Sequence, residues 1–382
     1  MISMPYDLAK LPIPSVLRPI ADAGIALARL DERIARSAVG EGFLERAHFA
    51  DACASLWIDG ELVHLEDLVL HDAGHDIRTP THELTIARDV LRSRRRIASQ
   101  PPGWALSPDG LRTLRQAWPA LSLHADSTVG SLKTTGDPAS VEGGEGESAS
   151  EIHASPFDAE LAEIDAVLAR SDSAIEEARR TGPAESARTA RDPLVYDLDW
   201  DEDARLEEWR CVLQQIGELP PVLQAIVALD AWNELAVLQH APWLGRLLAA
   251  SILRQARVTT AAHLTAVNLG LKSIPVDRRR HRDRETRLLA ITQGLIATAG
   301  LGLKEHDRLV LARQMMERKL TGRRTSSKLP ELIELVMAKP LISAGMVVKT
   351  LEVTPQAARR IVSELGLREM TGRGRFRAWG IM

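Results

Sequence analysis

The chain has 382 residues, of which 45% are hydrophobic, and a formal net charge of −4 at pH 7. This length favours two or three domains, and the nearly balanced charge excludes a globally basic nucleic-acid binder, so any such function must rest on local basic clusters. The two cysteines, Cys53 and Cys211, have no zinc-type spacing and fit a reducing compartment. Without a signal-like start or a long apolar run, we expect a cytoplasmic protein with no membrane partner.

The first part of the chain carries apolar side chains at helical spacing, and strand-like alternation is scarce there. We predict an N-terminal helical region over residues 1–123. Its helices are expected over residues 15–37, 42–58 and 81–99.

Histidines cluster between the last two of these helices. On a helix, His71 and His75 would share one face and could bind a metal. Gly74 and Pro80 instead favour a loop between residues 64 and 82, with the histidines spread over a polar surface, so we expect no metal site. The cluster consists of His64, His71, His75 and His82.

Residues 124–156 are rich in Gly, Ser, Thr and Glu, which predicts a disordered, flexible linker. Helical periodicity returns over residues 157–320, and we expect this helical core to pack with the N-terminal region as one domain. Separate helices are predicted over 285–300 and 304–320. The basic run from 277 to 285 is expected to be a solvated helix face, with an extended nucleic-acid footprint as the alternative.

The last part of the chain, residues 328–382, contains start and stop signals for short helices. Thr354 is suited to cap a helix, Pro355 to occupy its first position and Gly366 to end it. The helix between them has an apolar stripe, which predicts a face packed on a core. The stripe consists of Ala358, Ile361, Val362 and Leu365.

The opposite face of this helix carries polar side chains. Arginine can pair with guanine and glutamine with adenine in the major groove, so this face has the form of a recognition helix. We predict that it reads DNA bases through Gln356, Arg359, Arg360 and Ser363.

Two short strands are predicted around the sequence TGRG, whose glycines permit a tight turn. Arg373, Arg375 and Arg377 alternate there and are predicted to bind DNA phosphates. Helices and hairpin together predict a winged helix-turn-helix that binds double-stranded DNA, with a homodimer on an inverted repeat as the expected working form. A helical domain used for protein contact is the alternative.

One motif in the helical region resembles a motif of Fic proteins, a family that often carries a C-terminal winged helix. Ser55, Asp59 and Gly60 are similar to its inhibitory pattern Ser/Thr-x-x-x-Glu-Gly/Asn, with Asp in place of Glu. The architecture also resembles a group of rhizobial plasmid proteins with a C-terminal helix-turn-helix. These resemblances imply a mainly α fold with a Fic-like helical body and a C-terminal winged helix-turn-helix.

A second motif resembles the Fic active loop: His240 matches its catalytic His, and Gly245-Arg246 its Gly-Arg pair. Fic enzymes transfer a nucleotide monophosphate with that His as base, an acidic metal ligand and a glycine-rich phosphate nest. Here the acid, the Gly-Asn pair and the second Arg are missing. We therefore expect His240 to be a helix-end histidine, Asp59 to lack its arginine partner, and the body to hold no cofactor.

The preferred function is DNA binding, as a transcriptional regulator with a catalytically degenerate Fic-like body. The resemblance to the rhizobial group implies a plasmid-borne locus. A Fic-like nucleotidyl (AMP) transferase with an unusual active loop is the first alternative. An antitoxin-like scaffold that binds another protein is the second.

Overall fold

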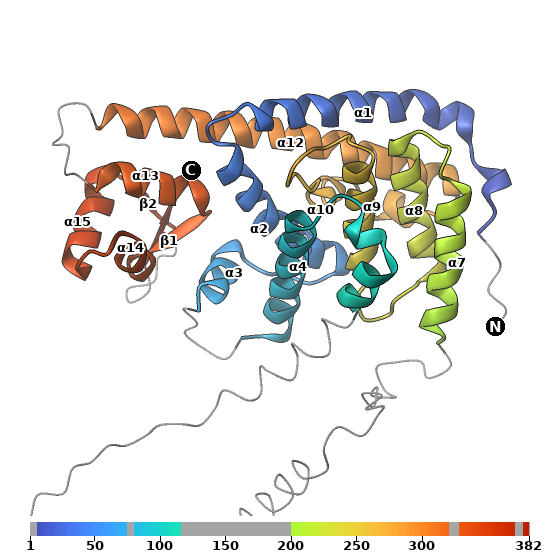
Figure 1. Ribbon diagram of the computed structural model, residues 1–382, viewed down its shortest axis with the longest axis horizontal. Coiled ribbons are helices and arrows are strands. Elements are labelled where there is room, and N and C mark those ends of the chain that lie inside the picture. The colour runs from blue at the N-terminus through green and yellow to red at the C-terminus, as the bar shows by residue number, and fades with distance from the viewer. Residues whose placement is uncertain (1–5, 75–79, 116–199, 321–327, 371–376, 382) are drawn as a thin grey trace, which may run out of the picture. The chain divides into compact units, whose positions relative to one another are not determined.

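The chain is mainly helical and ends in a small domain of helices and short strands (Figure 1), so the predicted mainly α fold class is confirmed. The described helices and strands all belong to one unit. The predicted linker, 124–156, lies outside the described residues. The computed structural model describes residues 6–74, 80–115, 200–320, 328–370 and 377–381.

The first long helix, α1 (Ile13–Ala35), begins in a proline-containing segment, where the missing amide hydrogen breaks no helical hydrogen bond. Its buried side chains recur every three or four residues from Val16 to Ile34. This apolar face packs along the long helix α12 (Arg284–Arg318). A short 3-10 turn, η1 (Leu8–Lys10), precedes α1.

Residues with clear capping roles mark the end of the next long helix and the start of the one after it. α2 (Gly40–Asp59) ends at Gly60, whose φ of 99° is a left-handed conformation that glycine adopts without strain. α4 (His82–Ser99) begins after Thr81, whose hydroxyl accepts a hydrogen bond from a backbone amide of the first turn.

The segment between these helices corrects the expectation of a loop over residues 64–82. Leu65–Asp72 form a helix, α3, whose apolar side chains are buried. Tertiary packing thus stabilises a helix too short to be stable alone. His71 is buried in α3, and His75 lies outside the described residues. Within the described ranges, no three metal-ligating side chains gather at one place.

In the second half of the body, α7 (Glu202–Gln215) packs on α8 (Pro221–Leu235). Trp209 and Trp232 meet edge to face between them, with ring centroids 5.1 Å apart. α9 (Trp243–Gln255) is almost completely buried. Shorter elements of the body are α10 (Val267–Leu271), α11 (Val276–Arg279) and the 3-10 turn η2 (Trp104–Leu106), and residues 108–115 are also helical.

α12 is one continuous helix, where the sequence predicted two. Two of its glycines lie at close approaches to neighbouring elements. A Cβ atom on Gly294 would lie 2.7 Å from the side chain of Leu271, and one on Gly302 would lie 2.6 Å from that of Leu30. Close packing therefore offsets the usual cost of glycine in a helix.

By length and composition alone, α12 is apolar enough to cross a membrane. Half of its most apolar 18-residue window is buried inside the protein. The helix packs against α1, α8 and α10, as the core helix of a globular protein also does.

A fully buried ion pair joins α2 and α4. The side chains of Asp51 and Arg94 are both inaccessible to solvent. Asp51 also accepts hydrogen bonds from Asn268 Nδ2 (2.7 Å) and the amide of Leu269 (3.0 Å), and Arg94 donates to the carbonyl of Leu264 (2.8 Å). Because both charges are paired and hydrogen-bonded, the interior tolerates them, and the network ties α10 to both helices.

The C-terminal domain contains a three-stranded antiparallel sheet with the order β1-β3-β2. Leu341 of the first strand and Arg368 of the second both pair with Gly380 of the third. The first strand was not predicted, because three residues are too few for alternation to show. The elements are α13 (Leu329–Ala338), β1 (Leu341–Ser343), α14 (Ala344–Leu351), α15 (Pro355–Leu365), β2 (Arg368–Glu369) and β3 (Ala378–Gly380).

Arg46 of α2 connects the helical body to this domain. It donates hydrogen bonds to the carbonyl oxygens of Val336 (2.6 Å), Met337 (3.1 Å) and Lys339 (2.7 Å). These groups lie at the end of α13, where carbonyls lack helical partners and a positive charge is favourable. Burial lowers the pKa of Arg46 to about 10, so the group stays charged at neutral pH.

Candidate functional site

The predicted recognition helix is α15, which follows α14 after a short turn. Glu352 ends α14 in a left-handed conformation (φ 54°). Thr354 then caps α15 by accepting a hydrogen bond from the amide of Ala357 (3.3 Å), and Pro355 occupies the first helical position. Gly366 ends the helix with a φ of 69°. These local signals place α15 as the sequence predicted.

The two faces of α15 differ in exposure. The apolar stripe of Ala358, Ile361, Val362 and Leu365 is buried in the domain core. The four residues predicted to read bases are all exposed. Within the described part of the chain, the side chains of Arg359 and Arg360 form no hydrogen bond or ion pair, so their guanidinium groups are available to a ligand. The exposed face consists of Gln356, Arg359, Arg360 and Ser363.

The predicted wing is described only in part. β2 and β3 pair, and the amide of Met370 donates to the carbonyl of Ala378 (2.8 Å). Arg377 is exposed directly before β3, with its Nε atom 3.6 Å from a carboxylate oxygen of Glu369. An exposed pair of this kind contributes little and can yield to a phosphate. Arg373 and Arg375 lie outside the described residues.

His240 lies in the loop between α8 and α9, not at the end of a helix as expected. Its side chain is mostly buried, and its Nδ1 atom is 3.2 Å from Glu202 Oε1. This contact ties the loop to the start of α7. His240 thus has a structural partner in the helical body.

Asp59 has an arginine partner, which corrects the expectation that it lacks one. Both terminal nitrogens of Arg246 bind its carboxylate, at 3.0 and 2.6 Å. Arg246 also donates to Ser55 Oγ (3.0 Å), so two residues of the first motif meet an arginine of the second. Gly60 serves to end α2.

Gly245 has a packing role. A Cβ atom at this position would lie 2.3 Å from the Trp232 ring. The glycine therefore lets α9 approach α8 closely. This role differs from the phosphate nest that a Gly-Arg pair forms in the Fic active loop.

Arg284, in the basic run 277–285 that was expected to be a solvated helix face, is mostly buried, and so is Arg287 just after the run. Arg284 and Arg287 both bind Glu234, at 3.1 and 2.6 Å, and Arg287 also binds the buried Asp230 at 2.7 Å. The sequence contained a signal for these ion pairs. Asp230 and Glu234 are four residues apart on α8, and Arg284 and Arg287 are three residues apart at the start of α12, so each pair shares one helix face. Pairing them required knowledge of the fold.

The chain matches known families in two places. Residues 329–382 match the family described as "HTH DNA binding domain", and residues 194–321 match the family described as "Protein of unknown function (DUF1612)". The first match implies DNA binding by the C-terminal domain.

A full-length relative is known from a rhizobium, as the sequence resemblance implied. The chain is 69% identical over 381 residues to "Uncharacterized protein y4cF" of Sinorhizobium fredii (strain NBRC 101917 / NGR234), with 99% of this chain and 100% of that protein covered. The chain therefore belongs to the family of y4cF, and its DUF1612 region is followed by a C-terminal helix-turn-helix DNA-binding domain.

Proposed function

We propose that the chain is a sequence-specific DNA-binding protein that regulates transcription. The observation that carries this proposal is the outward face of α15, where Gln356, Arg359, Arg360 and Ser363 are exposed side by side. A helix inserted into the major groove presents such donors to base edges, where arginine pairs with guanine and glutamine with adenine.

The wing supplies the second contact of the proposed complex. Arg377 flanks β3 and is positioned to bind a phosphate beside the groove that α15 enters. One helix-turn-helix reads only a short half-site, so two copies on an inverted repeat complete the proposed complex. A cytoplasmic location and a plasmid-borne target locus are further parts of the proposal.

The test is selection of bound sequences from random DNA, followed by a mobility-shift assay on the best site and on the DNA upstream of the gene. We expect a single preferred motif with two inverted half-sites. Arg359→Ala should lose preference at one base position of each half-site, at a cost of about 1–3 kcal/mol. Lys304→Ala, an exposed charge change on α12, is the matched control and should bind like the parent. If the DNA selected by the protein shows no enriched sequence, the proposal is contradicted.

For the helical body we infer a Fic-like scaffold without transfer activity. The contact of Ser55 and Asp59 with Arg246 supports the likeness, because it joins the two resembling motifs. The contact of His240 with Glu202 argues against a free catalytic base.

The corresponding test is incubation of the protein with labelled ATP and Mg²⁺, with a cell lysate as acceptor. We expect no label on any protein, and none after Asp59→Gly either. Label that disappears in His240→Ala would instead show a nucleotidyl transferase.

A further inference from the structure

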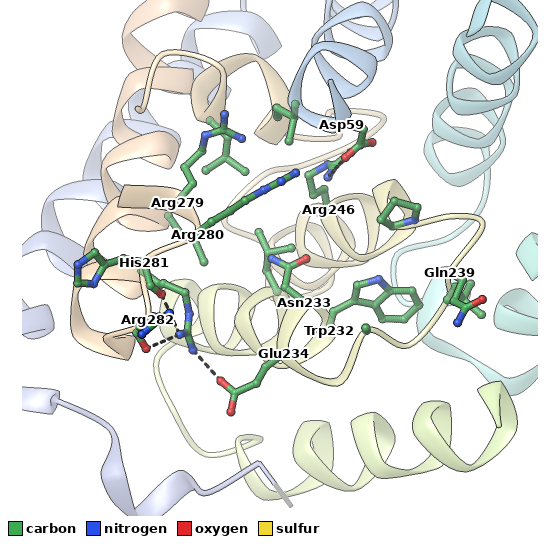
Figure 2. A pocket seen from close by; sticks show the side chains of 18 residues that line it. Asp59, Trp232, Asn233, Glu234, Gln239, Arg246, Arg279, Arg280, His281 and Arg282 are labelled. Atoms are coloured by element: carbon green, nitrogen blue, oxygen red, sulfur yellow. Dashed lines mark hydrogen bonds and ion pairs between the residues drawn. The ribbon is translucent and has the colours of Figure 1, made fainter. Parts of the chain in front are cut away.

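A cleft in the helical body lies apart from the DNA-reading helix. It has a volume of about 570 Å³, within the range of about 300–1,000 Å³ typical of small-molecule sites. The end of α2, the loop between α8 and α9, and the segment from α11 to the start of α12 line it (Figure 2). Most of its lining belongs to the region that matches the family of unknown function.

The lining of this cleft is strongly positive in a chain whose net charge is −4. Five arginines and two carboxylates line it, so the balance is five minus two, or +3. The carboxylates, Asp59 and Glu234, are bound by Arg246 and Arg287. The surplus therefore comes from the other three arginines: Arg279, Arg280 and Arg282.

The surplus arginines come from one short segment, residues 279–282. Figure 2 shows the Arg280 side chain extending toward Arg246. Across the described part of the chain, neither Arg280 nor Arg282 forms a side-chain hydrogen bond or ion pair. Burial lowers the pKa of Arg279, and the charges of Arg280 and Arg246 lower it further. Like charges held together in this way favour an anion between them.

Arg246 provides a second, independent observation. Its side chain is 6% exposed, and its Nε atom is buried without a hydrogen-bond partner in the described structure. An unpaired buried donor costs free energy unless a ligand or water satisfies it. The positive end of the cleft thus contains an unsatisfied donor.

The rest of the cleft is largely apolar, with Asn233, Gln239 and His281 as its further polar residues. Ile58, Leu229, Trp232, Leu238 and Ile291 line it beside the arginines. Such a wall can pack against the apolar part of a bound ligand. Guanidinium groups bind phosphate oxygens through paired hydrogen bonds, for which the planar fork of arginine is well suited.

We propose that this cleft binds a small phosphorylated molecule, with its phosphate groups between Arg246, Arg279 and Arg280 and its remainder against the apolar wall. The site is separate from the recognition helix, so the bound molecule is a ligand of the helical body. Binding is non-covalent and requires no transfer step.

The test is isothermal titration of the full chain with inorganic pyrophosphate. Arg280→Gln should weaken binding by about tenfold, as expected for the loss of a hydrogen bond to a charged group. Arg278→Gln is the matched control, because Arg278 is exposed in the same basic run but does not line the cleft; it should bind within about twofold of the parent. Both side chains are exposed, so the variants should fold, which their melting temperatures will show.

Two further measurements decide what occupies the cleft. Titration with ADP asks whether the apolar wall contributes: tighter binding than pyrophosphate, lost in Arg280→Gln, supports the proposal in full. The proposal is overturned if pyrophosphate and ADP both fail to bind, or if the control variant weakens binding as much as Arg280→Gln. It is also overturned if the Arg280 variant loses affinity for DNA alone, since the basic run would then belong to a DNA footprint. The effect of Arg359→Ala on DNA sequence preference tests α15 alone, so it does not decide whether the cleft binds a phosphorylated ligand.

Discussion

Gly42 of α2 lies so close to Met337 of α13 that a Cβ atom at position 42 would be 2.4 Å from the Met337 carbonyl oxygen. Only a residue without a side chain permits this approach. The same carbonyl accepts a hydrogen bond from Arg46, one turn further along α2. The contact between the helical body and the DNA-binding domain thus depends on a glycine and an arginine that are four residues apart.

Replacement of Gly42 by Ala should therefore destabilise the protein. Because the clash is with backbone, α2 or α13 must move, at a cost of about 1–3 kcal/mol in the free energy of unfolding. The matched control is Gly300→Ala in α12, where nothing lies within 4 Å of the added methyl group. That variant should gain up to about 1 kcal/mol from helix propensity. Urea unfolding measures both, and equal effects would contradict the close contact.

Removal of Arg94 should be among the most damaging single changes. Arg94→Met leaves the charge of Asp51 buried and uncompensated, which typically costs about 3–5 kcal/mol. Arg112→Met breaks the exposed ion pair with Asp109 and should cost less than about 1 kcal/mol. Thermal unfolding followed by circular dichroism compares the two variants. Similar melting temperatures would show that Asp51 is not buried as described.

Asp89 should make stability dependent on pH. Its side chain is 4% exposed, its Oδ2 atom is unpaired in the described structure, and burial raises its pKa to about 6. A folded-state pKa above the unfolded value of about 3.9 means that its stabilising effect is complete below about pH 4 and lost as pH rises through 6.

The measurement is urea unfolding of the parent and of Asp89→Asn between pH 4 and 7. The advantage of the Asn variant should grow with pH across this window and then level off. Asp109→Asn, at an exposed carboxylate, is the control for the Asp-to-Asn change itself. A flat difference for Asp89→Asn would mean that its carboxyl group has an ordinary pKa in the folded protein.

Substitutions in the recognition helix and in the wing should weaken DNA binding in different ways. Arg360→Ala should weaken binding to the preferred DNA site more than to random DNA, because base contacts carry the specificity. Arg377→Ala should weaken binding to both about equally and lower the salt slope by about one ion. Salt-titrated binding curves on both DNAs measure this. If neither variant differs from the parent, the domain contacts another protein rather than DNA.

The features that the sequence predicted well depend on neighbouring residues. The cap at Thr354, the proline after it and the glycine at position 366 define α15 within a dozen residues or so, and the stripe along the helix separates its two faces. The strand β1 shows the limit of such signals. It has three residues and gains its structure only by pairing with β3.

The cleft and the contacts beside it could not be predicted from the sequence, because they depend on how the helices pack. Asp59 and Arg246 are 187 positions apart in the chain, and no local pattern pairs them. From the sequence we expected Asp59 to lack its arginine partner, because the Fic-like motif has no second Arg, and only the fold brings Arg246 to it. The basic run was visible in the sequence, whereas the orientation of three of its arginines into a cleft depends on how α11 meets α12.

α12 connects the cleft to the recognition helix α15. Near its first turn, Arg287 lines the cleft, and just past its end Lys319 donates a hydrogen bond of 2.6 Å to the last carbonyl of α15. With a rise of about 1.5 Å per residue, its 35 residues span about 50 Å. If a rigid helix of this length tilts by about 1° at one end, its other end moves by about 1 Å. That movement is about a third of the length of a hydrogen bond to a base edge.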